Sequence, residues 1–258
     1  MASGAHIPHF ANPPSGSPGS VAASSASSPS PSRSGMLHSF FLAGPAGRLE
    51  ALLNEGTAEA PYASLVCHPH PSGGGTMHNK VVYHAAKVFS ARGWPVLRFN
   101  FRGTGLSEGA HHGKAEAEDV TAALAWLSER YSLPIVAAGF SFGAAMGLRA
   151  SCGNPAVRAF AALGLPTHAE GRDYHYAFLT RCAFPKLLLS GDRDQYAPAD
   201  QLRALAGSAA PPTQLNLIPR ADHFFTGHIQ AMQTALGQWL QDTFLATLPQ
   251  APTTEVTP

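Results

Sequence analysis

Short apolar runs alternate with longer amphipathic stretches along most of the chain. Runs of four to six mostly apolar residues without strict alternation predict strands that are buried on both faces, as in a parallel sheet. The expected strands are 64–67, 95–100, 135–140, 160–163, 186–190 and 214–218. Helical spacing of apolar residues predicts helices over 79–92, 115–131, 142–150, 199–208 and 227–246. This repeated order of strand and helix predicts a doubly wound α/β fold with a mostly parallel sheet.

A hairpin is expected before the first of these units. Residues 39–42 and 48–54 read as two strands, and Gly44-Pro45-Ala46-Gly47 between them supplies the turn residues that a reversal needs. The sheet should therefore carry an antiparallel N-terminal hairpin at one edge.

The two ends of the chain have a different composition. Ser, Pro, Ala and Gly make up 27 of the first 35 residues, which leaves too little apolar surface to offset the entropy of ordering. We expect 1–35 to be a disordered extension, with a targeting segment as the alternative. The region 36–248 is expected to form one folded domain, and 249–258 a flexible Pro- and Thr-rich tail.

Charge and composition exclude several classes of partner. The net charge is +1, and only 13% of the residues are charged, against about 25% in an ordinary globular protein. Such a balance provides no footprint for nucleic acid, and no apolar run approaches the roughly 18 residues of a membrane span. We expect no nucleic-acid partner and no membrane insertion; near-neutral charge also favours uncharged or weakly charged small-molecule substrates.

Three cysteines, Cys67, Cys152 and Cys182, are too few and too scattered to predict a disulfide scaffold. Cys67 lies in a strand pattern and is expected to be a core residue rather than a reactive thiol. A reducing compartment, the cytoplasm, is the expected location.

The segment Gly139-Phe140-Ser141-Phe142-Gly143 matches the pattern G-x-S-x-G between an expected strand and an expected helix. A serine on so tight a turn has a strained backbone, and side chains two residues before and after it would collide, hence the glycines. The hydroxyl of Ser141 is then exposed above the sheet, with the amide of Phe142 and the helix N-terminus directed toward an oxyanion formed there.

A base and an orienting carboxylate should follow a nucleophilic serine. Gly191-Asp192-Arg193-Asp194 comes directly after the strand that ends at Ser190, and Ala221-Asp222-His223 follows the strand 214–218. Both segments lie at the edge where functional groups of open α/β sheets gather. His223 is the candidate base, and Asp194, Asp192 and, less favourably, Asp222 are the candidate carboxylates.

Over about residues 38–246 the chain resembles the α/β-hydrolases, in particular small, nearly lidless serine hydrolases related to dienelactone hydrolases and serine aminopeptidase-like hydrolases. The resemblance rests on the serine and histidine segments above, the G-D-x-D segment, and two further motifs. These are His68-Pro69-His70-Pro71 with the glycine run after it, and Phe101-Arg102-Gly103-Thr104-Gly105-Leu106-Ser107. It implies that Asp194, the second acid of G-D-x-D, is the triad carboxylate, while Asp192 holds the turn.

The second oxyanion donor of this fold comes from the loop after the third strand. Prolines 69 and 71 have no amide hydrogen, which leaves His70, Ser72 and the following glycines. The resemblance points to the amide of His70, although Pro69 stands where glycine is common in the family.

The pocket is expected to be open, because only about twenty residues separate the strand 160–163 from Lys186. Its expected lining residues are aromatic: Tyr176, Phe178, Tyr196 and Phe224, with Phe142. We assign no metal and no cofactor, since His68, His70 and the pair His111-His112 have no supporting ligands at metal spacing.

These observations predict a serine hydrolase that cleaves carboxylic esters with short or aromatic acyl groups through an acyl-enzyme. Amides, thioesters, lactones or acyl transfer are alternatives that fold analogy does not separate. A weakly catalytic ligand-binding relative is the alternative from another class. The sequence leaves the physiological substrate and the oligomeric state open.

Overall fold

Eight strands form one sheet in the computed structural model, which describes residues 36–169, 172 and 174–244. The strands are β1 (Leu37–Gly44), β2 (Gly47–Asn54), β3 (Ala63–Cys67), β4 (Val96–Phe99), β5 (Ile135–Phe140), β6 (Val157–Leu163), β7 (Lys186–Gly191) and β8 (Thr213–Ile218). The helices are α1 (Lys80–Ser90), α2 (Glu116–Tyr131), α3 (Phe142–Ser151), α4 (Ala199–Ser208) and α5 (Ile229–Phe244), with short 3₁₀ turns η1 (Pro71–Gly73) and η2 (Ala177–Arg181). The expectations for 1–35 and 249–258 concern residues outside the described ranges.

The strand order is β1-β2-β4-β3-β5-β6-β7-β8. The pairs β1–β2 and β2–β4 are antiparallel, and all other pairs are parallel. This confirms the predicted α/β architecture with an antiparallel N-terminal hairpin. Because β3, β5, β7 and β8 run in the same direction, their carboxyl ends lie at one edge of the sheet.

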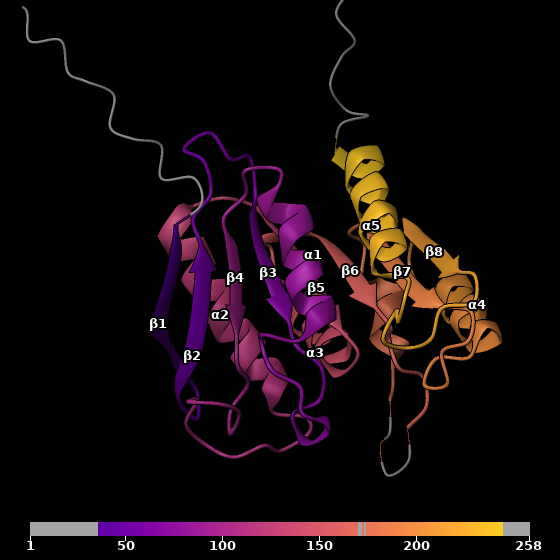
Figure 1. The fold of residues 1–258 in the computed structure, drawn as a ribbon, viewed down its shortest axis with the longest axis horizontal. Helices are drawn as coiled ribbons and strands as arrows, with labels where there is room; N and C mark the ends of the chain where they lie inside the picture. The colour runs from indigo at the N-terminus through magenta and orange to yellow at the C-terminus, as the bar shows by residue number, and fades with distance from the viewer. Residues whose placement is uncertain (1–35, 170–171, 173, 245–258) are drawn as a thin grey trace, which may run out of the picture. The chain divides into compact units, whose positions relative to one another are not determined.

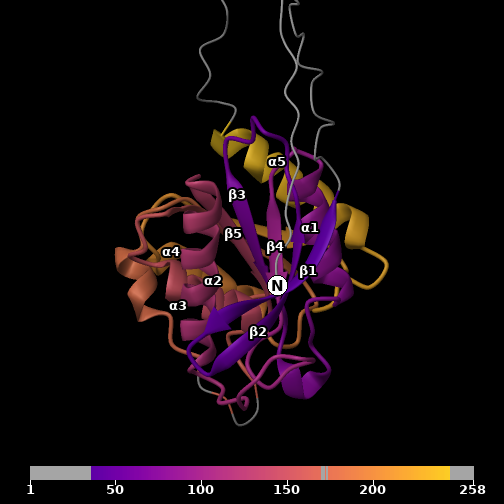
Figure 2. The same ribbon diagram turned by 90° about the vertical axis from the view of Figure 1, so that its left-hand side faces the viewer.

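Helices cover both faces of the sheet, and successive strand residues point into two different cores. Leu65 packs in the core beneath α2 and α3, whereas its neighbour Val66 packs in the core with α1 and α5. Figure 1 shows this division from the front, and Figure 2 shows α2, α3 and α4 on one side of the sheet with α1 and α5 on the other. Burial on both faces explains why the parallel strands read as continuous apolar runs.

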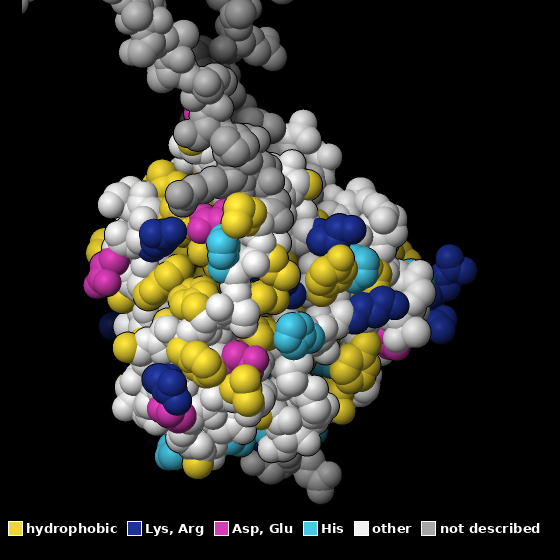
Figure 3. All heavy atoms as spheres, turned by 60° about the vertical axis from the view of Figure 1, so that its left-hand side comes forward, with side chains coloured by type: hydrophobic (Ala, Val, Ile, Leu, Met, Phe, Trp, Pro, Cys, Tyr) yellow, Lys and Arg dark blue, Asp and Glu magenta, His cyan; other side chains and the backbone are white. Residues whose placement is uncertain are grey.

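The hairpin forms the exposed edge of the sheet. Along β1 the side chains of Leu37 and Phe41 remain exposed, and the guanidinium of Arg48 on β2 lies 4.9 Å from the centre of the Phe41 ring. Figure 3 brings this edge forward and shows apolar side chains dispersed among charged and histidine side chains. Charged groups beside an edge strand disfavour pairing with another chain.

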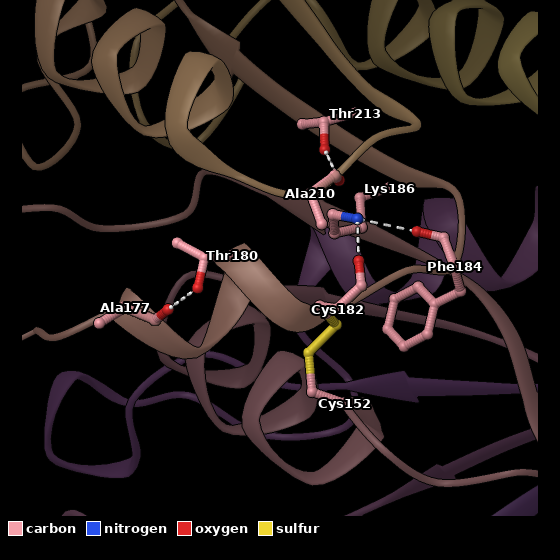
Figure 4. The surroundings of a disulfide bond; sticks show 8 residues. All are labelled: Cys152, Ala177, Thr180, Cys182, Phe184, Lys186, Ala210 and Thr213. Carbon is pink, nitrogen blue, oxygen red and sulfur yellow. Dashed lines mark hydrogen bonds between the residues drawn. A yellow bond between two sulfur atoms is a disulfide. The ribbon is translucent and has the colours of Figure 1, made fainter.

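A disulfide joins Cys152 and Cys182, which corrects the expectation drawn from the cysteine count. The two residues are 30 positions apart, but Cys152 follows α3 and Cys182 follows η2, and the fold brings their Cα atoms to 5.3 Å. Figure 4 shows the bond beside the ammonium of Lys186, which donates to the carbonyl oxygens of Cys182 and Phe184. Disulfides are typical of oxidising compartments, so this bond does not favour the expected reducing one; the cytoplasmic location stays a prediction.

Cys67, the remaining cysteine, is fully buried at the end of β3, and burial raises the pKa of its thiol. It is thus a core residue, as its strand pattern indicates. Across the described ranges, no helix combines the length and the apolar character that crossing a membrane requires.

Candidate active site

The turn between β5 and α3 holds Ser141 in an unusual backbone conformation. Its φ is 54° and its ψ is −119°, in the left-handed half of the conformational map, which non-glycine residues seldom occupy. A Cβ on Gly139 would collide with the carbonyl of Gly143, and a Cβ on Gly143 would collide with the carbonyls of Cys67 and His68. The two glycines therefore allow α3 to begin directly against β5 and the end of β3, as the motif predicts.

A hydrogen-bonded chain connects three side chains from the ends of β5, β7 and β8. The Nε2 atom of His223 lies 3.0 Å from the hydroxyl oxygen of Ser141. On the other side of the ring, Nδ1 lies 2.8 Å from Oδ2 and 3.0 Å from Oδ1 of Asp194. His223 and Asp194 are almost fully buried, so the Nδ1 proton is directed at the carboxylate and Nε2 is left to accept a proton from Ser141.

Asp194, and not Asp192, is the carboxylate that contacts the imidazole. Its Oδ2 accepts a 2.7 Å hydrogen bond from the hydroxyl of Ser190, and its Oδ1 accepts one of 2.9 Å from the amide of Tyr196. These two hydrogen bonds fix the plane of the carboxylate. Asp192 instead accepts a 2.6 Å hydrogen bond from the amide of Arg220 and so holds the β8 turn, as expected.

Asp222, the third candidate, also faces elsewhere. Its Oδ1 accepts a 2.8 Å hydrogen bond from the amide of Thr226, within the loop that leads to α5. Hydrogen bonds from this loop lower the pKa of Asp222 against the opposing effect of burial, which is the largest single influence on it.

Two backbone amides are the candidates for an oxyanion site. The amide of Phe142 belongs to the first residue of α3, and the first amides of a helix have no acceptor within the helix. The amide of His70 follows β3, and within the described residues it donates to no backbone carbonyl, although the His70 carbonyl accepts from Gly73 and Gly75. The rings of His70 and Phe142 pack edge-on with centroids 4.8 Å apart, so the two segments adjoin.

A polar network that sequence reasoning missed supports the loop of His70. The amide of Ser72 donates to Nδ1 of His70 at 3.1 Å, and Nε2 of His70 lies 3.2 Å from Nε2 of His111. Nδ1 of His111 lies 2.7 Å from Oε1 of the buried Glu116, which also accepts hydrogen bonds from the amides of residues 112 and 113. The acid that completes this network is five residues from His111 and at the start of α2, a spacing that carries no recognisable signal.

The imidazole of His68, the other histidine of this loop, is fully buried and contacts polar groups of the backbone. Its Nε2 accepts a 2.9 Å hydrogen bond from the amide of Phe101, and its Nδ1 lies 2.6 Å from the carbonyl oxygen of Pro69. Burial, the largest influence, lowers the pKa of His68 to about 4. Within the described part of the chain, no group of three or more His, Cys, Asp or Glu side chains is arranged to hold a metal ion.

Two cavities lie beside the turn of residues 141 and 142. The smaller, of about 180 Å³, is lined by Ser141 and His223 and by the expected pocket residues Tyr196 and Phe224. The larger, of about 800 Å³, is lined by Phe142 and by the expected residue Tyr176. The two cavities share three lining residues, His70, Arg172 and Tyr174, and are therefore adjacent.

Phe178, the remaining expected pocket residue, lines neither of these cavities. Its ring lies beneath the guanidinium of Arg149, at 5.3 Å, and 6.2 Å from the ring of Tyr176. Tyr176 itself donates a 2.6 Å hydrogen bond to the carbonyl of Pro166, and burial raises its pKa well above the ordinary value. Tyr176 is thus held in place as part of the wall.

Comparison with known proteins agrees with this fold and geometry. The sequence model of the family described as "Alpha/beta hydrolase domain" matches residues 63–245. An uncharacterised protein from Rickettsia prowazekii is 34% identical over 208 residues, covering 78% of this chain and 87% of that protein. The chain therefore belongs to the α/β-hydrolase domain family.

Solved structures give the same result. An alpha-beta serine hydrolase homologue from Coxiella burnetii is 35% identical, with a TM-score of 0.72 over 78% of this chain and 96% of that one. XC6422 from Xanthomonas campestris, described as an α/β serine hydrolase without a lid, is 29% identical, with a TM-score of 0.70 over 84% of this chain and 97% of that one. The fold is thus that of the lidless serine hydrolases, as the sequence motifs indicate.

Proposed function

We propose that the protein hydrolyses carboxylic esters, with Ser141 as nucleophile, His223 as general acid and base, and Asp194 as the orienting carboxylate. The observation that carries this proposal is the continuous chain of contacts from Asp194 through His223 to Ser141, with steps of 2.8 and 3.0 Å. Nucleophile, base and orienting acid within hydrogen-bond reach are the signature of an activated serine.

Each step of the reaction can be assigned to an atom of this site. Nε2 of His223 accepts the hydroxyl proton while Oγ of Ser141 attacks the carbonyl carbon, and the carbonyl electron pair moves onto oxygen. The amides of Phe142 and His70 donate hydrogen bonds to this oxyanion. The imidazolium then protonates the alcohol oxygen as its bond to carbon breaks, which leaves an acyl group on Ser141.

Water completes the cycle. His223 accepts a proton from the attacking water molecule, a second tetrahedral intermediate forms, and its collapse returns the proton to Oγ and releases the acid. The positive end of α3 and the free first-turn amide support the oxyanion in both halves of the reaction.

The size of the smaller cavity favours a short acyl or aromatic group at the serine. About 180 Å³ walled by Tyr196 and Phe224 accommodates a few carbon atoms or one ring, and it offers little space for a long acyl chain. The proposed partner of the protein is therefore a small-molecule ester that serves as its substrate. Thioesters and lactones remain substrates to compare, because the same attack geometry serves them.

The test is hydrolysis of p-nitrophenyl esters of increasing chain length, together with labelling by a fluorophosphonate. Wild-type protein should hydrolyse the acetate faster than long-chain esters, and Ser141→Ala should remove both hydrolysis and labelling. Ser208→Ala, at an exposed serine at the end of α4, is the matched control and should retain both. Labelling of Ser141→Ala at unchanged stoichiometry would contradict the assignment. Ligand binding by wild type without turnover of any ester or thioester would instead favour the non-catalytic relative.

A further inference from the structure

The larger cavity contains an excess of cationic side chains. Lys114 from the loop before α2, Arg149 from α3, and Arg172 all line it, together with His70, His111 and His112. No aspartate or glutamate is among its described lining residues. Three separate segments of the chain thus each contribute a cationic residue to the wall of one space of about 800 Å³.

Some arginines among the described residues form ion pairs, and the two at the larger cavity do not. Arg48, Arg102 and Arg130 each form an ion pair with a glutamate or aspartate. Among the described residues, Lys114, Arg149 and Arg172 form no ion pair with an aspartate or glutamate. All three residues are exposed.

The polar contacts of the two arginines are with neutral groups. Arg149 donates a 3.4 Å hydrogen bond to the carbonyl of His175 and lies over the ring of Phe178, and Arg172 interacts with the hydroxyl of Tyr174. A guanidinium held by neutral partners keeps its charge available for a ligand anion.

The effect of this charge is visible at the neighbouring histidine. The pKa of His70 is lowered to about 4, mostly by burial and in addition by the charges of Arg172 and His111, against the opposing effect of Glu116. Burial disfavours a charge of either sign, but the repulsion between Arg172 and a protonated His70 is an attraction for an anion in the same space.

The remaining walls are apolar and aromatic. Phe142, Met146, Tyr174 and Tyr176 line the same cavity, and the rings of the two tyrosines are stacked with centroids 6.3 Å apart. A ligand that fits these walls has a short apolar or aromatic body and an anionic end. Because His70, Arg172 and Tyr174 also line the cavity of Ser141, such a body can extend from one cavity into the other.

We propose that the larger cavity binds an anionic group, a carboxylate or a phosphate, on the ester whose carbonyl lies at Ser141. The inference rests on the proposed function and narrows its substrate class to anionic esters. It departs from the expectation, drawn from the near-zero net charge, that uncharged or weakly charged substrates are preferred, since local and not total charge decides what a cavity attracts.

The test compares charged and neutral esters of matched shape. On the acyl side the pair is p-nitrophenyl hydrogen glutarate and its methyl ester. On the alcohol side the pair is p-acetoxybenzoate and methyl p-acetoxybenzoate, with p-acetoxyphenyl phosphate as the phosphate probe. The anionic-to-neutral ratio of kcat/KM is measured in wild type, Arg172→Gln, Lys114→Gln and Arg149→Gln. Arg203→Gln, which removes the same charge from the exposed face of α4, is the matched control.

In wild type the ratio should exceed one for at least one pair and fall as salt is added. It should fall about tenfold in Arg172→Gln, as expected for the loss of one charge-assisted hydrogen bond, and stay unchanged in Arg203→Gln. Ratios of one or less for every pair, or an equal fall in the control, would overturn the inference while leaving the esterase proposal intact.

Absence of turnover for all esters would count against the proposed function alone. In that case calorimetric titration of the protein with benzoate and phenyl phosphate decides the inference independently. Binding that weakens in Arg172→Gln but not in Arg203→Gln supports the anion site, and equal or absent binding overturns it.

Discussion

At the scale of single residues, the position of one carboxylate decides how the imidazole of His223 acts. Asp194 accepts hydrogen bonds from Ser190 and Tyr196 and faces Nδ1 of His223. Asp192, two residues earlier, accepts a hydrogen bond from the amide of Arg220 and faces the turn. The two acids share a turn and a residue type, so replacing each in turn isolates the contact with His223.

We expect Asp194→Asn to reduce kcat by about 10⁴-fold with little change in KM, because the amide favours the wrong tautomer of the imidazole. Asp192→Asn should keep kcat within a few-fold and lower the free energy of unfolding by about 1 kcal/mol, as weakening one hydrogen bond does. Steady-state kinetics and urea unfolding of both variants provide the measurement. A larger loss of kcat in Asp192→Asn would reverse the assignment.

The residues of this chain that could be predicted from the sequence are those that belong to a local pattern. Ser141 stands in a five-residue motif, and Asp194 and His223 directly follow apolar strands, so each could be located without tertiary information. The contact of Glu116 with His111 is local but follows no recognisable spacing, and the position of Arg172 at both cavities depends on segments that meet only in the folded chain.

At the scale of elements, helix α3 joins the nucleophile turn to the disulfide. Its first residue, Phe142, follows Ser141, and its last, Ser151, precedes Cys152, which is bonded to Cys182 at the end of η2. The strands and helices could be predicted because their apolar spacing is local. The disulfide was missed because 30 residues separate its cysteines and no spacing rule connects them.

Loss of this bond should destabilise the fold by about 3.5 kcal/mol, because the reduced chain regains the loop entropy that the bond removes. For a domain of this size the melting temperature should fall by about 10 °C. The comparison is between wild type and the double variant Cys152→Ser, Cys182→Ser, each melted with and without dithiothreitol. Reductant should lower the melting temperature of wild type and leave that of the double variant unchanged; equal melting of all four samples would show that the bond contributes nothing.

At the scale of the whole molecule, buried neutral histidine makes stability depend on pH. The imidazole of His68 forms hydrogen bonds with the backbone of Pro69 and Phe101. Its pKa is about 4, well below the ordinary value of 6.5. Between these two values the unfolded chain binds a proton that the folded chain does not. The free energy of unfolding therefore decreases as the pH falls from about 6.5 to about 4 and is unaffected by this group above 6.5.

For His68 alone the expected loss is about 3 kcal/mol by pH 4. Urea unfolding across this pH range measures it, with His68→Gln as the test variant, since glutamine can accept the amide hydrogen bond without titrating. His168→Gln, at an exposed histidine, is the control. The pH dependence should become shallower in His68→Gln and not in His168→Gln; identical slopes in all three proteins would contradict the role given to burial.

The disulfide at the end of α3 affects how this site can change during evolution. Helix α3 has ten residues and is about 15 Å long. It begins after Ser141 and ends before Cys152, which is bonded to Cys182. Cys182 ends the segment that carries Tyr176, a lining residue of the larger cavity. Ser141 and this part of the cavity wall are thus joined through α3 and the disulfide. Under the proposed function, we expect substitutions on the surface of that wall to alter which ester is accepted while the geometry at Ser141 is inherited unchanged, so that single substitutions can change specificity.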